Sequence, residues 1–135
     1  MVPRKYMSRT IIKTKNAPAA VGAYNQGIVA NGFIFTAGQI PLNPKTNKLV
    51  DGDAKTQIDQ IFKNLDAICR SGATSLGKAV KLTVFLTDLT LAPYVNKAID
   101  NLFDSNSYPA RSMVEVSKLP LNSRIEIECI AVIDE

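Results

Sequence analysis

Two residues near the end of the chain are of types that could act together on a small anionic molecule. Arg111 follows Pro109, which ends a helical region and favours an extended entry into a strand. A guanidinium at a strand start presents a rigid fork of donors that matches a carboxylate or a phosphate. Glu126 lies on the next predicted strand, which is otherwise nearly all apolar. The two residues predict a small-molecule site, and the alternative is an ordinary salt bridge between strands.

The absence of histidine limits the catalytic mechanisms that this chain could use. The chain contains no histidine, which excludes Ser-His and Cys-His nucleophile schemes and argues against a zinc or iron site. Acid–base chemistry near neutral pH must then use a carboxylate, a lysine, a tyrosine, a cysteine or water. Cys69 and Cys129 fall on predicted apolar faces, which favours buried, reduced thiols in a reducing compartment over a disulfide.

Length and composition predict one ordinary globular domain. The chain has 135 residues, of which 46% are hydrophobic and 21% are charged. Its net charge of +4 permits an anionic substrate and does not require nucleic acid. No apolar run predicts a membrane span or a signal peptide. We expect a loose extension over residues 1–7, a single domain over residues 8–135 and a cytoplasmic protein, with a mitochondrial location as the alternative.

The first half of the chain predicts three strands and a helix. One short strand begins at Ile11, and Asn31-Gly32 is a hairpin signal between strands at 28–30 and 33–36. After a loop over 41–53, Asp53 caps a helix that ends at Gly72. The apolar stripe of this helix consists of Ile58, Ile61, Phe62, Leu65, Ile68 and Cys69.

The second half predicts a strand, a helix and two further strands. The alternating core residues of the strand are Val80, Leu82, Val84 and Leu86. Thr90 can cap the helix, with Pro93 in its first turn. The stripe of that helix consists of Leu91, Val95, Ala98, Ile99, Leu102 and Phe103. With strands at about 111–119 and 123–133, the order β-β-β-α-β-α-β-β indicates an α+β fold in which two helices pack on one face of a mixed sheet.

The last strand has two different faces. We expect one face to pack on the helices; it comprises Ile125, Ile127, Cys129, Ala131 and Ile133. The opposite face changes from charged to apolar and comprises Glu126, Glu128, Ile130 and Val132. An apolar half on a face that two helices cannot reach predicts an oligomer interface, with the glutamates at its polar end.

Four separated groups of residues carry a further pattern. They are NAPAAVGAYNQG at 16–27, TAGQIP at 36–41, KLTVFLTDL at 81–89, and a C-terminal group with PARS at 109–112, VEV at 114–116, LP at 119–120 and IEIE at 125–128. In this order and without large gaps, from about Ser8 to the C-terminus, they resemble the Rid family of reactive intermediate deaminases, also called the YjgF or L-PSP family. The resemblance implies a chorismate-mutase-like fold assembled as a homotrimer, with three sites in the clefts between subunits.

The resemblance also implies roles for individual residues. Arg111 would hold the substrate carboxylate, and Glu126 would hold a water near the reacting carbon. Tyr24 would wall the pocket, and Asn96 would lie near it. The alternatives are a surface strand residue for Glu126, a core residue for Tyr24 and a solvated helix residue for Asn96.

Gly38 and Met113 complete the implied site. Gly38 would allow the backbone to approach the ligand closely, or else would mark a bulge at the strand end. Backbone groups around Gly38 and Met113 would complete the pocket. Met113 stands where many members have a cysteine, and Ala37 stands where deaminase-type members often have a serine.

The implied activity is hydrolytic deamination of 2-iminobutanoate and 2-iminopropanoate to 2-keto acids and ammonia, without cofactor or metal. Two alternatives stay open. The family has also been described as an endoribonuclease and inhibitor of translation, which would act on single-stranded RNA. The changes at Ala37 and Met113 are compatible with a non-catalytic trimer that only binds small molecules.

Overall fold

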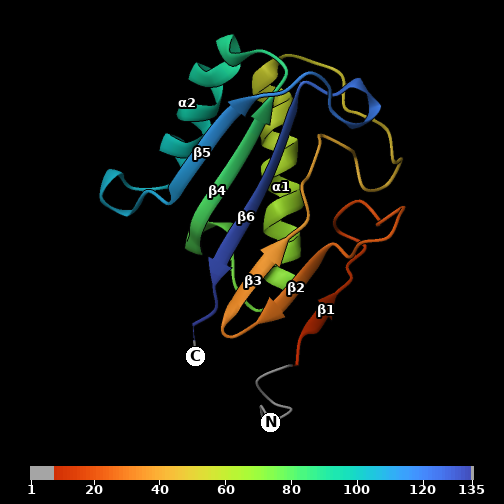
Figure 1. Ribbon diagram of the computed structural model, residues 1–135, viewed down its shortest axis with the longest axis vertical. Helices are drawn as coiled ribbons and strands as arrows, with labels where there is room; N and C mark the ends of the chain where they lie inside the picture. The colour runs from red at the N-terminus through yellow and green to blue at the C-terminus, as the bar shows by residue number, and fades with distance from the viewer. Residues whose placement is uncertain (1–7, 135) are drawn as a thin grey trace.

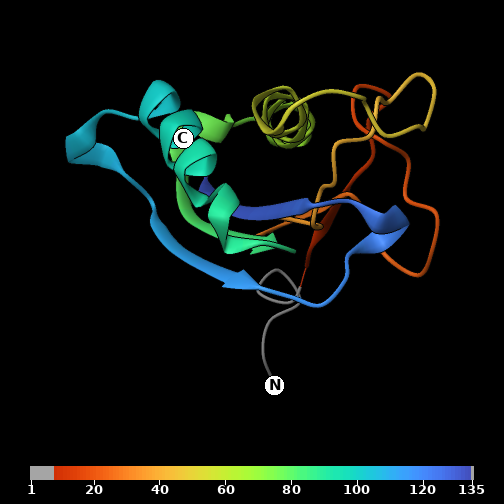
Figure 2. The same cartoon turned by 90° about the horizontal axis from the view of Figure 1, so that it is seen from above.

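A six-stranded mixed sheet forms the body of the protein, and two α-helices cover one of its faces (Figures 1 and 2). The structure is a computed structural model, and it describes residues 8–134. The predicted extension over residues 1–7 lies outside the described residues. The strands are β1 (Thr10–Ile12), β2 (Gly27–Ala30), β3 (Phe33–Thr36), β4 (Ala79–Leu86), β5 (Ala110–Glu115) and β6 (Ile125–Val132). The helices are α1 (Ala54–Ser71) and α2 (Ala92–Leu102). The α+β fold and its element order, predicted from the sequence, are confirmed.

The sheet places the last strand in its centre. The strand order is β1-β2-β3-β6-β4-β5, so β6 lies between β3 and β4, and β5 forms an edge. Every pairing is antiparallel except that of β4 with β5. Those two strands are parallel because α2 connects them as a crossover, which returns the chain to the same end of the sheet.

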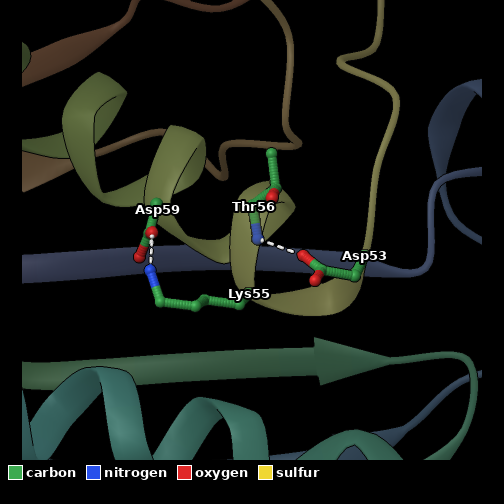
Figure 3. Close-up of polar contacts among 4 residues, drawn as sticks. All are labelled: Asp53, Lys55, Thr56 and Asp59. Atoms are coloured by element: carbon green, nitrogen blue, oxygen red, sulfur yellow. Dashed lines mark hydrogen bonds and ion pairs between the residues drawn. The ribbon is translucent and has the colours of Figure 1, made fainter.

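Helix α1 begins and ends where the sequence predicts, although the geometry of its end differs. The carboxylate of Asp53 accepts a hydrogen bond of 2.9 Å from the backbone N–H of Thr56, and Lys55 pairs with Asp59 one turn along (Figure 3). Gly72 caps the other end, but the residue with a left-handed backbone there is Ala73, with φ of 66°.

Steric space explains Gly72 better than backbone freedom does. A Cβ atom on Gly72 would lie 2.7 Å from Cδ1 of Ile34, a buried residue of β3. The glycine therefore lets the end of α1 approach the sheet closely.

The two faces of the sheet differ in burial. Leu82, Val84 and Leu86 of β4 point toward the helices and are fully buried. On the opposite face, which carries no helix in Figure 2, Phe35 and Val114 are 42% and 44% exposed. Ile130 and Val132 of β6, the expected apolar half of this face, are partly buried, and an oligomer interface on this face stays a prediction.

Several local expectations were wrong. Val80 is exposed because a bulge between Ala79 and Lys81 shifts the register and gives its core place to Ala79. Leu102 at the end of α2 is also exposed. Asp88 accepts a hydrogen bond from the N–H of Thr90, so Asp88 is the cap of the turn before α2.

The strands β5 and β6 are shorter than the expected ranges of 111–119 and 123–133. Within residues 8–134, neither helix has the length and apolar character that crossing a membrane requires.

Candidate functional site

One cavity gathers three of the six predicted site residues. Tyr24, Gly38 and Glu126 line a cavity of about 320 Å³, hereafter the Glu126 pocket. Glu126 lies on β6, on the sheet face that the helices leave open. Gly38 follows β3, and Tyr24 comes from the loop between β1 and β2. The Tyr24 hydroxyl accepts a hydrogen bond of 3.3 Å from the N–H of Val21, which holds the ring against its own loop.

Gly38 makes room for the carboxylate of Glu126. A Cβ atom at position 38 would lie 2.5 Å from Oε2 of Glu126, closer than atoms can approach without a shift. The glycine has no left-handed backbone, so steric space rather than conformational freedom explains it. We expected the space beside Gly38 to be occupied by a ligand. In the structure, the Glu126 side chain occupies this space.

The environment of Glu126 favours the protonated form of its carboxyl group. Burial of the half-exposed side chain raises its pKa above the ordinary value, and the neighbouring charge of Glu128 acts in the same direction. A carboxyl group tuned in this way can give and take a proton closer to neutral pH than an exposed one.

Apolar residues that the sequence did not single out form much of the pocket wall. They are Val21, Ile40, Leu42, Pro120 and Leu121. Leu121 is 64% exposed and has a left-handed backbone with φ of 56°, which is rare for a leucine. The Leu119-Pro120 pair, part of the C-terminal group that resembles the Rid family, was the sequence feature that could have indicated this wall. The residue types there do not predict the left-handed backbone of Leu121.

Two buried amide side chains hold the loops around the pocket. Gln26 accepts a hydrogen bond from the N–H of Thr14 at 2.7 Å and donates to the carbonyl of Pro18 at 2.8 Å. Asn64 of α1 donates to the carbonyl of Leu42 at 2.9 Å. Because buried amides are costly when unpaired, these bonds fix the loops that bear the pocket wall.

Arg111 and Asn96 belong to a different cavity. This Arg111 pocket has a volume of about 410 Å³ and is also lined by Ile99, Asp100, Tyr108 and Pro109. Arg111 donates a hydrogen bond to Oδ1 of Asn96 on α2, and Tyr108 donates one to Asp100. None of the ion pairs among residues 8–134 involves Arg111, so its charge is available to an anionic ligand.

The two pockets lie on opposite faces of the sheet. Arg111 pairs with Leu82 across the parallel β4–β5 ladder, so its side chain shares the helix-covered face. Glu126 pairs with Phe85, which points to the open face. The interpretation of Arg111 and Glu126 as an ordinary strand-to-strand salt bridge is therefore wrong, and one chain does not bring the two groups into one cavity.

Met113 and Ala37 take structural positions. Met113, two residues after Arg111 on β5, is partly buried and packs against the hydrophobic core. The N–H of Ala37 donates a hydrogen bond of 2.8 Å to the carbonyl of Gln26, next to the Glu126 pocket. Among residues 8–134, no cluster of three acidic, cysteine or histidine side chains could hold a metal ion.

Known proteins resemble this chain over nearly its whole length. A family model described as Endoribonuclease L-PSP matches residues 14–133. The 2-iminobutanoate/2-iminopropanoate deaminase of Escherichia coli K12 is 45% identical over 128 residues, which cover 93% of this chain and 98% of that protein.

Solved structures share the fold. YyfA from Yersinia pestis, described as a Rid-family protein of unknown function, has a TM-score of 0.89 and 43% identity, and the match covers 93% of this chain and 100% of that one. TdcF of Escherichia coli, crystallised with bound serine, has a TM-score of 0.81 and 37% identity, with 93% and 99% covered. The family model and these relatives span nearly all of the chain, and it therefore belongs to the Rid family, whose model is described as Endoribonuclease L-PSP.

Proposed function

We propose that this protein hydrolyses 2-imino acids, such as 2-iminobutanoate and 2-iminopropanoate, to 2-keto acids and ammonia. The observation that carries the proposal is the half-buried carboxylate of Glu126 in an apolar pocket, in a chain 45% identical to a protein named for this activity. The balanced reaction adds one water to the C=N bond and releases the nitrogen as ammonia. Imines of this kind hydrolyse in water unaided, so positioning and one acid–base group suffice to accelerate them.

In this proposal Arg111 binds the substrate and Glu126 transfers protons. The guanidinium of Arg111, which forms no ion pair among the described residues, binds the substrate carboxylate, and Asn96 on α2 orients it. The carboxylate of Glu126 orients the attacking water, takes a proton from it and returns a proton to the departing nitrogen. The raised pKa of Glu126 suits both transfers near neutral pH. Serine bound to TdcF is a carboxylate-bearing amino acid, which fits the same division.

The proposal requires two chains for each site. Because Arg111 and Glu126 lie on opposite faces of one sheet, a substrate that contacts both must sit between subunits. The open sheet face offers the contact surface, with exposed Phe35 and Val114 upon it. We propose a homotrimer, and sedimentation equilibrium should then give three times the chain mass of 14.7 kDa. A monomer at micromolar concentration would remove the shared site.

An ammonia-release assay tests the activity. A pyridoxal-phosphate dehydratase acting on threonine or serine generates the imines in place, and ammonia is followed with and without this protein. Accelerated release of ammonia, with no change in consumption of the amino acid, supports the proposal. An unchanged release rate at saturating protein would reject it.

The family model is described as an endoribonuclease, so RNA cleavage is a second candidate activity. An endoribonuclease acting on single-stranded RNA would have to work without histidine, because the chain has none. Salt-sensitive RNA binding accompanied by cleavage would favour this alternative. Tight binding of a 2-keto acid without turnover would instead favour a non-catalytic binding trimer.

A further inference from the structure

Two thiols that the proposed chemistry does not use lie in contact inside the core. The sulfur atoms of Cys69 on α1 and Cys129 on β6 are 3.9 Å apart, and both side chains are buried. They are the two cysteines of the chain, and 60 residues separate them in sequence. A disulfide holds its sulfur atoms about 2.05 Å apart, so the two sulfur atoms must move closer together for a bond to form.

The surroundings make the two thiols unequal. Hydrogen bonding between the sulfur atoms lowers the pKa of Cys129 and raises that of Cys69. The hydroxyl of Thr36 lowers the pKa of Cys129 further, and the same hydroxyl accepts the backbone N–H of Cys129 at 3.0 Å. The Thr36 hydroxyl lies beside Cys129, which favours this sulfur as the nucleophile, and the sulfur of Cys69, 3.9 Å away, is already in place to resolve its oxidation product.

We propose that Cys69 and Cys129 form a reversible disulfide within one chain when the protein meets a small peroxide. The Cys129 thiolate attacks one peroxide oxygen, the O–O bond breaks, and Cys129 becomes a sulfenic acid while hydroxide leaves. The sulfur of Cys69 then attacks the sulfenic sulfur, and the hydroxyl group departs as water after taking a proton. Both sulfur atoms are oxidised, hydrogen peroxide is reduced, and the net reaction turns two thiols and one peroxide into one disulfide and two waters.

The bond would tie the central strand of the sheet to the longer helix. β6 carries Cys129 on the side that faces α1, whereas Glu126 projects from the other face of the same strand. The disulfide would therefore lie outside the Glu126 pocket. It would restrict the unfolded chain over a long loop, so the oxidised protein should melt about 5–15 °C higher than the reduced protein.

Mass spectrometry of the full chain provides the test. The folded protein is treated with hydrogen peroxide, blocked with iodoacetamide and digested with trypsin without reduction. Cleavage after Lys63, Arg70 and Arg124 places the two thiols on peptides 64–70 and 125–135. We expect these two peptides joined, an intact mass lower by two hydrogen atoms, and full reversal of both the link and the melting shift by dithiothreitol.

Two controls make the result decisive. Protein treated in concentrated urea shows that the oxidant reacts with these thiols once they are exposed. The Cys69→Ser variant keeps Cys129 but removes its partner, so it should stop at a sulfenic acid that dimedone traps. If the folded wild-type protein keeps both thiols while the urea sample is oxidised, the proposal is wrong. It is equally wrong if the joined peptides come from links between chains, which intact mass distinguishes.

Discussion

Arg111 and Glu126 lie on strands of one sheet, but their side chains point to its opposite faces. Arg111 stands opposite Leu82 and Glu126 opposite Phe85, so the two positions differ by three residues along β4 and by two strands across the sheet. Strand geometry alone puts their backbones more than about 10 Å apart, with the sheet between their side chains. A site that uses both groups must therefore be completed by a second chain.

Replacement of Arg111 tests the carboxylate clamp. Arg111→Ala should abolish turnover and leave the fold intact, because the side chain is exposed and bonds to Asn96 rather than to the core. The lost charge-assisted bonds are worth roughly 2–4 kcal/mol of substrate binding. Arg111→Lys should restore only part of this, since an ammonium lacks the bidentate fork. A variant that is folded by circular dichroism and turns over imines at the wild-type rate would refute the role.

Glu126→Gln separates catalysis from binding. The amide keeps the size of the side chain but cannot accept a proton, so imine hydrolysis should fall about 10²–10⁴-fold toward the spontaneous rate. Binding of a 2-keto acid, measured by calorimetry, should change little because Arg111 still holds the carboxylate. Normal turnover with lost affinity would instead make Glu126 a binding or structural residue.

Gly38→Ala tests whether the carboxylate needs the space that the glycine provides. The new methyl group would lie 2.5 Å from Oε2 of Glu126 and would displace it. A misplaced catalytic group should cost about ten- to a hundredfold in turnover. Gly77→Ala is the matched control, because its nearest neighbour outside the adjacent residues is Oγ of Ser75 at 3.8 Å. Equal losses in the two variants would show that the Gly38 effect is not local.

The raised pKa of Glu126 also predicts how stability depends on pH. Burial and then Glu128 raise this pKa above its ordinary value of 4.5, so the folded protein holds the proton more tightly than the unfolded chain. Ionisation of Glu126 therefore destabilises the fold, with no effect well below pH 4.5 and the full effect above the folded-state pKa. Glu126→Gln should become more stable than wild type as the pH rises toward neutrality, as measured by urea unfolding midpoints at one protein concentration.

Asp53 provides a control, because its pKa is shifted in the direction opposite to that of Glu126. Its pKa is lowered because the carboxylate accepts a hydrogen bond from the backbone N–H of Thr56 (Figure 3), and the Thr56 side chain acts in the same direction. A lowered pKa contributes stability above the unfolded value, and that stability is lost as the pH falls. Asp53→Asn should therefore lose stability relative to wild type at neutral pH and converge with it in acid. Parallel behaviour of the two variants would contradict the assigned environments.

The sequence was sufficient for the parts of the fold that depend on local patterns. The stripe of α1 and its cap at Asp53 follow from helical periodicity and from the hydrogen-bonding capacity of one side chain. The alternation in β6 placed Glu126 on the face away from the helices, as observed. These features require no knowledge of distant partners.

The remaining features depend on register and on steric contacts between distant segments. The face that Arg111 occupies is set by its pairing with Leu82, and a shift of one residue would have reversed it. Tertiary contacts produce the close approach of Glu126 to Gly38 and the left-handed backbone of Leu121. The residue types at these positions do not predict such contacts.

A complementation experiment tests the shared site most directly. Arg111→Ala and Glu126→Gln chains, each inactive alone, are unfolded, mixed in equal amounts and refolded together, and mixed assembly is verified with two different affinity tags. If each site takes Arg111 from one chain and Glu126 from its neighbour, about a quarter of the sites regain both residues, and imine hydrolysis returns to about a quarter of the wild-type rate. Mixed oligomers that form but remain as inactive as either variant would contradict the account.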